Sequence, residues 1–105
     1  MSVQGHLRVS LLYFDGCPSW QEADQRLREA LARAGRNDVR VERHPVTTVE
    51  EAVATGFRGS PTVLVNGSDP FADTNAPVSL SCRVYRTESG LTGSPTIEQL
   101  LTVLR

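Results

Sequence analysis

The chain has 105 residues, of which 39% are hydrophobic and 22% are charged, as in an ordinary globular protein. Its 11 basic and 12 acidic side chains give a net charge of −1, which does not indicate a nucleic-acid-binding protein. No apolar run reaches the roughly 20 residues that cross a bilayer, and no export signal is visible. We therefore expect one cytoplasmic domain over 1–105, with 1–7 as a flexible tail, reduced cysteines, and neither nucleic acid nor membrane among its partners.

The first half of the chain predicts a strand, a helix and a second strand. Residues 8–14, RVSLLYF, carry hydrophobic side chains on both alternating faces, which is typical of a central strand covered on two sides. From Trp20 onward, apolar residues recur at helical spacing, and the expected core positions are Ala23, Leu27, Ala30, Leu31 and Ala34. Residues 39–44 alternate cleanly and predict a strand with Val39 and Val41 facing inward.

Capping and turn signals follow in the middle of the chain. Thr48, with Glu51 three residues later, matches a capping box and predicts the start of a short helix. Residues 62–66, TVLVN, predict a third strand. The pair Asn66-Gly67 at its end is a strong signal for a tight turn.

The last third of the chain predicts one more strand and one more helix. A loop over 67–77 leads to a strand over 79–86, which we expect to lie antiparallel to the third strand. Ser94 and Pro95 are expected to begin a final helix, with core positions at Ile97, Leu100, Leu101 and Leu104. The order β-α-β-α-β-β-α then predicts an α/β fold, with a four-stranded mixed sheet and helices on both faces.

Cys17 lies in the segment FDGCPSW, where the first predicted strand turns into the first helix. The N–H groups of a first helical turn lack intrahelical partners and carry partial positive charge, so they favour a thiolate over a thiol. Pro18 suits the first helical position, and Gly16 permits a bend that we expect to leave the sulfur uncovered. We interpret Cys17 as a reactive thiolate, with a buried cysteine that acts as a small hydrophobe as the alternative.

The strand order, the junction YFDGCPSW, the segment GFRGSPTVLVNG and the closing helix together resemble the thioredoxin superfamily, in its small glutaredoxin-like form. The resemblance extends from about Val9 to Leu104. It implies a nucleophile at Cys17 and a cis peptide bond before Pro61, packed beside the thiol. More narrowly, GSPTVLVNGSDPFAD and VSLSCRVYRTESGLTGSPTIEQL are similar to small actinobacterial thioredoxin-like proteins, some called alkylmercury-lyase-like, although residues for carbon–mercury cleavage are not evident.

The position of a second thiol departs from a CxxC pattern, because Trp20 stands where the second cysteine would be. The other sulfur belongs to Cys82, on a predicted strand two ladder spacings, roughly 9–10 Å, from the first strand. Since a disulfide needs Cα atoms within about 7 Å, Cys82 reaches Cys17 only by movement or an irregular chain path. We name Cys82 as a tentative resolving thiol, with plain strand packing as the alternative.

Four residues are candidates for substrate binding. Trp20 could be an aromatic lid over the thiol, or simply the first core residue of its helix. A cis bond at Pro61 would present the backbone of Ser60 to a bound peptide. Arg58 could bind the carboxylate of a low-molecular-weight thiol, or could remain solvated.

These observations predict a thiol–disulfide oxidoreductase or thiol-transfer protein of the monothiol type. Its substrate would be a protein or small-molecule disulfide, and an external thiol would release the mixed disulfide. We expect no cofactor, apart from a low-molecular-weight thiol as co-substrate, and no metal site, because close ligand pairs are lacking. The alternatives are a non-catalytic scaffold or binding module of the same fold, and a protein that binds a soft metal or an organomercurial.

Overall fold

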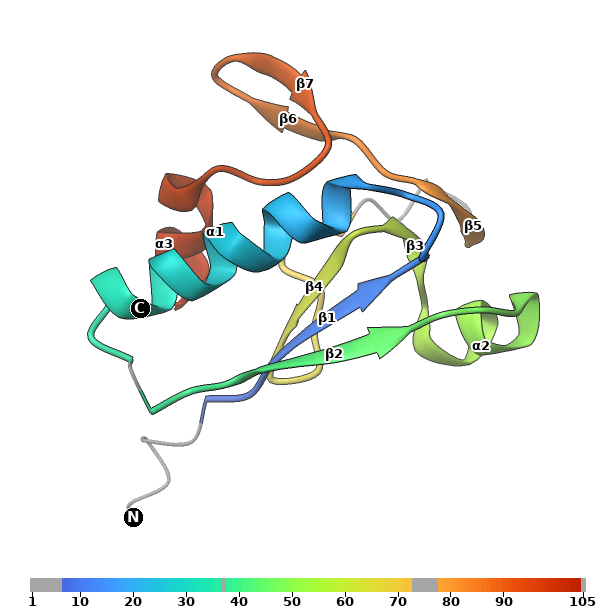
Figure 1. The fold of residues 1–105 in the computed structure, drawn as a ribbon, viewed down its shortest axis with the longest axis horizontal. Helices are drawn as coiled ribbons and strands as arrows, with labels where there is room; N and C mark the ends of the chain where they lie inside the picture. The colour runs from blue at the N-terminus through green and yellow to red at the C-terminus, as the bar shows by residue number, and fades with distance from the viewer. Residues whose placement is uncertain (1–6, 37, 73–77, 105) are drawn as a thin grey trace.

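The computed structural model describes residues 7–36, 38–72 and 78–104 (Figure 1). In chain order, its elements are β1 (Val9–Tyr13), α1 (Ser19–Arg33), β2 (Val41–Pro45), α2 (Val49–Thr55), β3 (Arg58–Ser60), β4 (Thr62–Val65), β5 (Ser79–Cys82), β6 (Tyr85–Thr87), β7 (Gly90–Thr92) and α3 (Ile97–Leu104). The mixed α/β class is as predicted. Residues 1–6 of the expected tail and 73–77 of the expected loop lie outside the described residues.

A three-stranded sheet in the order β2-β1-β4 forms the centre of the fold. β1 runs parallel to β2 and antiparallel to β4, so that Leu11 lies between Arg43 and Val63. Val9 and Leu11 belong to the core on one face of the sheet, and Leu12 belongs to the core on the other. The prediction of a central strand covered on both sides is therefore confirmed.

Helices α1 and α3 cover one face of this sheet (Figure 1). The buried residues of this larger core are Val9, Leu11, Ala23, Leu27, Ala30, Leu31, Val63, Leu100 and Leu104. Arg26 of α1 links this helix to the segment just before α3, because its guanidinium donates to the Ser94 hydroxyl at 2.9 Å and to the Pro95 carbonyl at 3.0 Å. Asp24 of α1 is buried and pairs with Arg43 of β2 at 2.7 Å, which fixes the helix over the sheet.

Helix α2 packs on the opposite face, so helices do lie on both faces of the sheet. The smaller core there consists of Leu12, Val46, Ala52 and Phe57. The Thr48 hydroxyl accepts a hydrogen bond from the Glu51 N–H at 3.1 Å, and the Glu51 carboxylate accepts one from the Thr47 N–H at 2.9 Å. These two bonds confirm the predicted start of this helix.

The predictions of a single fourth strand and of a four-stranded sheet are wrong. Residues 79–86 divide between β5, which pairs in parallel with β3, and β6, which pairs with β7. One reason is that Pro61, which lacks an N–H, separates β3 from β4. Another is that the turn at Asn66-Gly67 returns the chain only as far as a bridge between Val65 and Ser68, instead of starting a long hairpin.

The last helix begins later than predicted. The residue that caps it is Thr96, whose hydroxyl accepts from the Gln99 N–H at 3.1 Å while the Gln99 side chain accepts from the Thr96 N–H at 2.9 Å. Ser94 is buried and binds Arg26, so its hydroxyl has another role than the capping expected of it. The predicted apolar face of the helix is confirmed, since Leu100 and Leu104 are buried.

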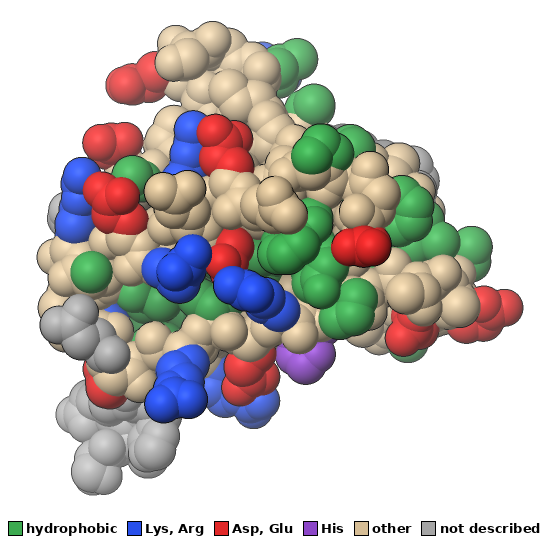
Figure 2. All heavy atoms as spheres, viewed as in Figure 1, with side chains coloured by type: hydrophobic (Ala, Val, Ile, Leu, Met, Phe, Trp, Pro, Cys, Tyr) green, Lys and Arg blue, Asp and Glu red, His purple; other side chains and the backbone are tan. Residues whose placement is uncertain are grey.

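Charged and apolar side chains divide the visible face of the molecule (Figure 2). Acidic and basic side chains intermix over α1, whereas apolar side chains gather towards the end of the molecule where α1 begins and β1 and β2 end. In the described part of the chain, every helix is too short or too polar to cross a membrane.

Candidate functional site

Cys17 lies between β1 and α1, in a turn closed by a hydrogen bond from its N–H to the Phe14 carbonyl at 2.9 Å. Gly16 fits this turn because a Cβ atom there would lie only 2.9 Å from the Phe14 ring. Pro18 already has helical backbone angles, and α1 begins at Ser19. The cysteine therefore lies at the start of the helix, as predicted.

The Cys17 side chain is buried, so the expectation of an uncovered sulfur is wrong. Its exposed fraction is 0%, and its Sγ donates a hydrogen bond to the Ser60 carbonyl at 3.6 Å. Ser60 directly precedes Pro61, and the peptide bond between them is cis, as expected from the resemblance. The structure thus brings Cys17 to the Pro61 segment, with its side chain buried away from solvent.

Cys82 is close to Cys17, although regular sheet geometry placed it much farther away. The register of β3 and β5 puts Cys82 opposite Ser60, whose carbonyl binds Cys17. The Cys17 side chain is the main cause of the raised pKa of the Cys82 thiol, which agrees with this close placement. The estimate of roughly 9–10 Å assumed one continuous ladder, whereas β5 pairs with β3, a strand spacing of about 4.8 Å.

The two thiols differ in exposure and in protonation. Both are free, but Cys17 is buried and Cys82 is exposed. The pKa of Cys82 is raised, chiefly by the hydrogen bond with the Cys17 side chain, and further by partial desolvation and by the charge of an ionised Cys17. Cys82 therefore keeps its proton to a higher pH than an isolated thiol does. The site therefore combines an exposed thiol with a raised pKa, Cys82, and a buried thiol, Cys17.

Ser60 does not present a free backbone to a peptide. Its carbonyl accepts a second hydrogen bond, from the Arg83 N–H at 2.8 Å, so β5 and the residue after it occupy this edge. The Ser60 hydroxyl is buried and has no partner among the described residues. Arg58 is partly buried at the other end of β3, opposite Ser79 in the register.

Arg83, which follows Cys82, is held by a network of largely buried groups. Its guanidinium donates to Asp69 at 2.8 Å and to the Phe71 carbonyl at 2.6 Å, and the side chains of Arg83 and Asp69 are 10% and 12% exposed. The same guanidinium lies 4.6 Å from the centre of the Tyr85 ring. The Tyr85 hydroxyl in turn donates to the Pro61 carbonyl. We call the three side chains of Asp69, Arg83 and Tyr85 the clamp.

Sequence reasoning missed the clamp. A single Asp and a single Arg in loop-like surroundings are ordinarily solvated, so nothing in their residue types marks them as a buried pair. The one available signal was the position of Arg83, directly after the second cysteine. Its partner Asp69 lies beyond the Asn66-Gly67 turn, and only the fold brings the two together.

The Trp20 ring of α1 contacts residues of the sheet. Its ring stacks on Tyr13 of β1 at 4.2 Å, and the Arg43 guanidinium lies 5.8 Å from the ring centre. It is partly buried against the larger core. These contacts are those of the core residue considered for this position; its role as a lid stays a prediction.

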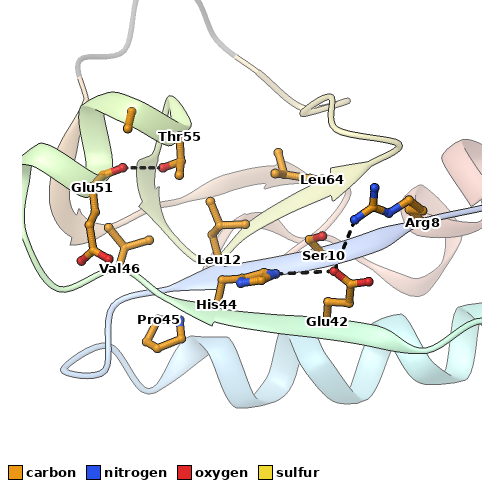
Figure 3. Close-up of a pocket in the computed structure, with 11 residues that line it drawn as sticks. Arg8, Ser10, Leu12, Glu42, His44, Pro45, Val46, Glu51, Thr55 and Leu64 are labelled. Carbon is orange, nitrogen blue, oxygen red and sulfur yellow. Dashed lines mark hydrogen bonds and ion pairs between the residues drawn. The ribbon is translucent and has the colours of Figure 1, made fainter.

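A groove lies on the sheet beside α2 (Figure 3). This groove has a volume of about 440 Å³, with Leu12 and Leu64 on its floor. Glu42 pairs there with Arg8 at 3.8 Å and with His44 at 3.6 Å. Neither cysteine lines the groove, so it is separate from the thiol site.

The described residues hold no group of three or more His, Cys, Asp or Glu side chains that could bind a metal ion. Comparison with known proteins gives no match to a family model, to a curated protein or to a solved structure. Functional inference for this chain therefore depends on its own fold and thiol geometry.

Proposed function

We propose that the chain is a thioredoxin-like thiol–disulfide oxidoreductase in which Cys17 and Cys82 are the reacting pair. The observation that carries the proposal is the convergence of the two cysteines on Ser60, whose carbonyl accepts from the Cys17 thiol at 3.6 Å and which lies opposite Cys82 in the strand register. The position of Cys17 at the start of α1 and the cis bond before Pro61 support the resemblance to that superfamily.

The reaction would proceed in two thiol–disulfide exchanges. In the first, the Cys82 sulfur attacks a disulfide RSSR′, forming a mixed disulfide with R and releasing R′SH, which takes up the thiol proton. In the second, Cys17 attacks the Cys82 sulfur and releases RSH. The protein loses two electrons and two protons, and the substrate disulfide gains them. An external dithiol, or two equivalents of a monothiol, would return the pair to the reduced state.

Exposure decides the order of attack in this proposal. A substrate sulfur can contact Cys82 directly, whereas Cys17 has no exposed surface. The raised pKa of Cys82 lowers its thiolate fraction at neutral pH and slows the first step. Slowing is a smaller obstacle than steric exclusion, so we assign the first attack to Cys82. Cys17 then resolves the mixed disulfide, which is the reverse of the roles predicted from the sequence.

A partner thiol inside the chain changes the expected class from monothiol to dithiol chemistry. The mixed disulfide would be released within the protein, because the neighbouring sulfur is at a high effective concentration. The external thiol is then needed only to reduce the internal disulfide. A low-molecular-weight thiol fits this second role, and Arg58 remains a candidate for binding its carboxylate.

The burial of Cys17 favours one competing function, a binding or scaffold module without turnover. In that case both cysteines would be structural, and neither single substitution would trap a substrate. The two functions are separated by incubating the protein with glutathione disulfide and analysing the product by intact mass.

The Cys17→Ser variant should accumulate one glutathione on Cys82, because the resolving thiol is missing. The Cys82→Ser variant should react at least tenfold more slowly, because only the buried thiol remains. The wild type should pass to an internal disulfide that carries no glutathione. Failure of all three proteins to react would contradict the proposed function, and faster modification of Cys17 than of Cys82 would contradict the proposed order.

A further inference from the structure

The clamp holds Arg83, the residue that directly follows Cys82 at the end of β5. β5 is short, and its pairing with β3 is interrupted by a register shift between Arg58 and Ser60. Cys82 is the last residue of β5 and is itself exposed. A short, irregular strand with an exposed end is a weak anchor for a sulfur that must stay within reach of Cys17.

Arg83 provides a firmer anchor for Cys82 than β5 does. Its N–H binds the carbonyl that also accepts the Cys17 thiol, and its guanidinium binds Asp69 and the Phe71 carbonyl on the other side. The Thr62 hydroxyl is a further acceptor, at 3.3 Å. Four contacts of one residue thus hold the backbone next to Cys82 against the Pro61 segment.

The neighbouring backbone is shaped for this approach. Gly59 has a φ of +115°, and a Cβ atom on it would lie 2.8 Å from the Arg83 Cβ and 3.2 Å from its Cα. No other residue type fits this position without moving Arg83. Tyr85 closes the clamp from the C-terminal side, through its ring contact with Arg83 and its hydrogen bond to the Pro61 carbonyl.

We propose that Arg83 is a positioning residue, whose clamp holds Cys82 beside Cys17 and so sets the effective concentration of the two thiols. This inference rests on the proposed function, because it concerns the same pair. A buried ion pair contributes little net stability compared with well-packed apolar residues, so its value here is to fix one geometry. Because the clamp already orders the backbone around Cys82 in the reduced protein, disulfide formation does not have to supply the conformational entropy cost of ordering it.

The test measures the equilibrium between the reduced protein with glutathione disulfide and the oxidised protein with two glutathione molecules. Its equilibrium constant is the effective concentration of the pair. A residue that only stabilises the fold stabilises the reduced and oxidised forms alike and leaves this constant unchanged. A positioning residue raises the fraction of the reduced protein in which the two thiols are in the reactive geometry, so its loss lowers the constant.

We expect Arg83→Gln to lower this constant at least tenfold, and Asp69→Asn to lower it in the same direction. Asp69→Asn keeps the shape of the side chain and serves where Arg83→Gln, which leaves a buried carboxylate unpaired, does not fold. Arg83→Lys should fall between the wild type and Arg83→Gln, because one ammonium cannot reproduce all the guanidinium contacts. The matched control is Arg86→Gln, an exposed arginine of β6, which should match the wild type.

The outcomes separate the two proposals. A wild type that forms no Cys17–Cys82 disulfide overturns the proposed function and this inference with it. A wild type that forms the disulfide, with Asp69→Asn and the folded Arg83 variants at the same constant, overturns the inference alone. A lowered constant in the clamp variants, with Arg86→Gln unchanged, supports the positioning role.

Discussion

Oxidation of the Cys17–Cys82 pair should raise the stability of the whole protein. The cross-link would close a loop of about 65 residues, which removes roughly 15 cal/mol/K of chain entropy from the unfolded state, or about 4 kcal/mol at 25 °C. In the reduced fold both cysteines already lie at Ser60, Cys17 through its hydrogen bond to the carbonyl and Cys82 through the strand register. Linking them therefore needs little distortion, and most of this gain should be observed.

Guanidinium unfolding of the oxidised and reduced proteins, followed by far-UV circular dichroism, measures the gain. The expected difference corresponds to about 20 °C in Tm for a domain of this size. The Cys82→Ser variant, treated with the same oxidant, is the control and should show no gain. An oxidised protein that carries the internal disulfide but is no more stable than the reduced one would refute the reasoning, because it would mean that the native fold holds the two sulfurs apart.

Four further predictions concern single side chains. Alkylation of Cys82 by iodoacetamide should have its midpoint at a higher pH in the wild type than in Cys17→Ala, because the main cause of its raised pKa is then removed; an equal midpoint would contradict this. Since the unfolded thiol ionises first, stability should also decline as the pH rises above the ordinary thiol value near 9, and less so in Cys17→Ala. Ser60→Ala should leave the free energy of unfolding, measured in urea, unchanged or raise it by up to about 1 kcal/mol, since a buried hydroxyl without a described partner is removed; a loss above that size would reveal a hidden hydrogen bond. Asp24→Asn should cost about 1–3 kcal/mol in the same assay, whereas Glu29→Gln, in an exposed pair, should cost under about 0.5 kcal/mol; equal effects would contradict the role given to burial.

Much of the central fold follows from local patterns in the sequence. The two-sided apolar pattern of β1, the stripe of α1 and the capping box at Thr48 depend on residues close together in the chain, and the structure confirms them. The pairing of β5 with β3 could not be predicted in this way. It depends on a break at Pro61 and on an irregular parallel register, neither of which leaves a periodic signal.

The site shows the same division. The position of Cys17 at the start of α1 was readable from the strand–Cys–Pro–helix order. Its burial and its proximity to Cys82 were not, because they depend on how the Ser60–Pro61 segment packs and on the pairing of β5 with β3. The clamp follows from that path as well, since the Arg83–Asp69 pair is buried only when β5 lies on β3.

The most direct test of the central claim is peptide mapping of the folded protein after treatment with excess glutathione disulfide and quenching in acid. If Cys17 and Cys82 are the reacting pair, the main product is a peptide linking Cys17 to Cys82, with two glutathione molecules released for each chain oxidised. Glutathione that remains on Cys82 while Cys17 stays reduced, or linkage only between separate chains, would contradict it.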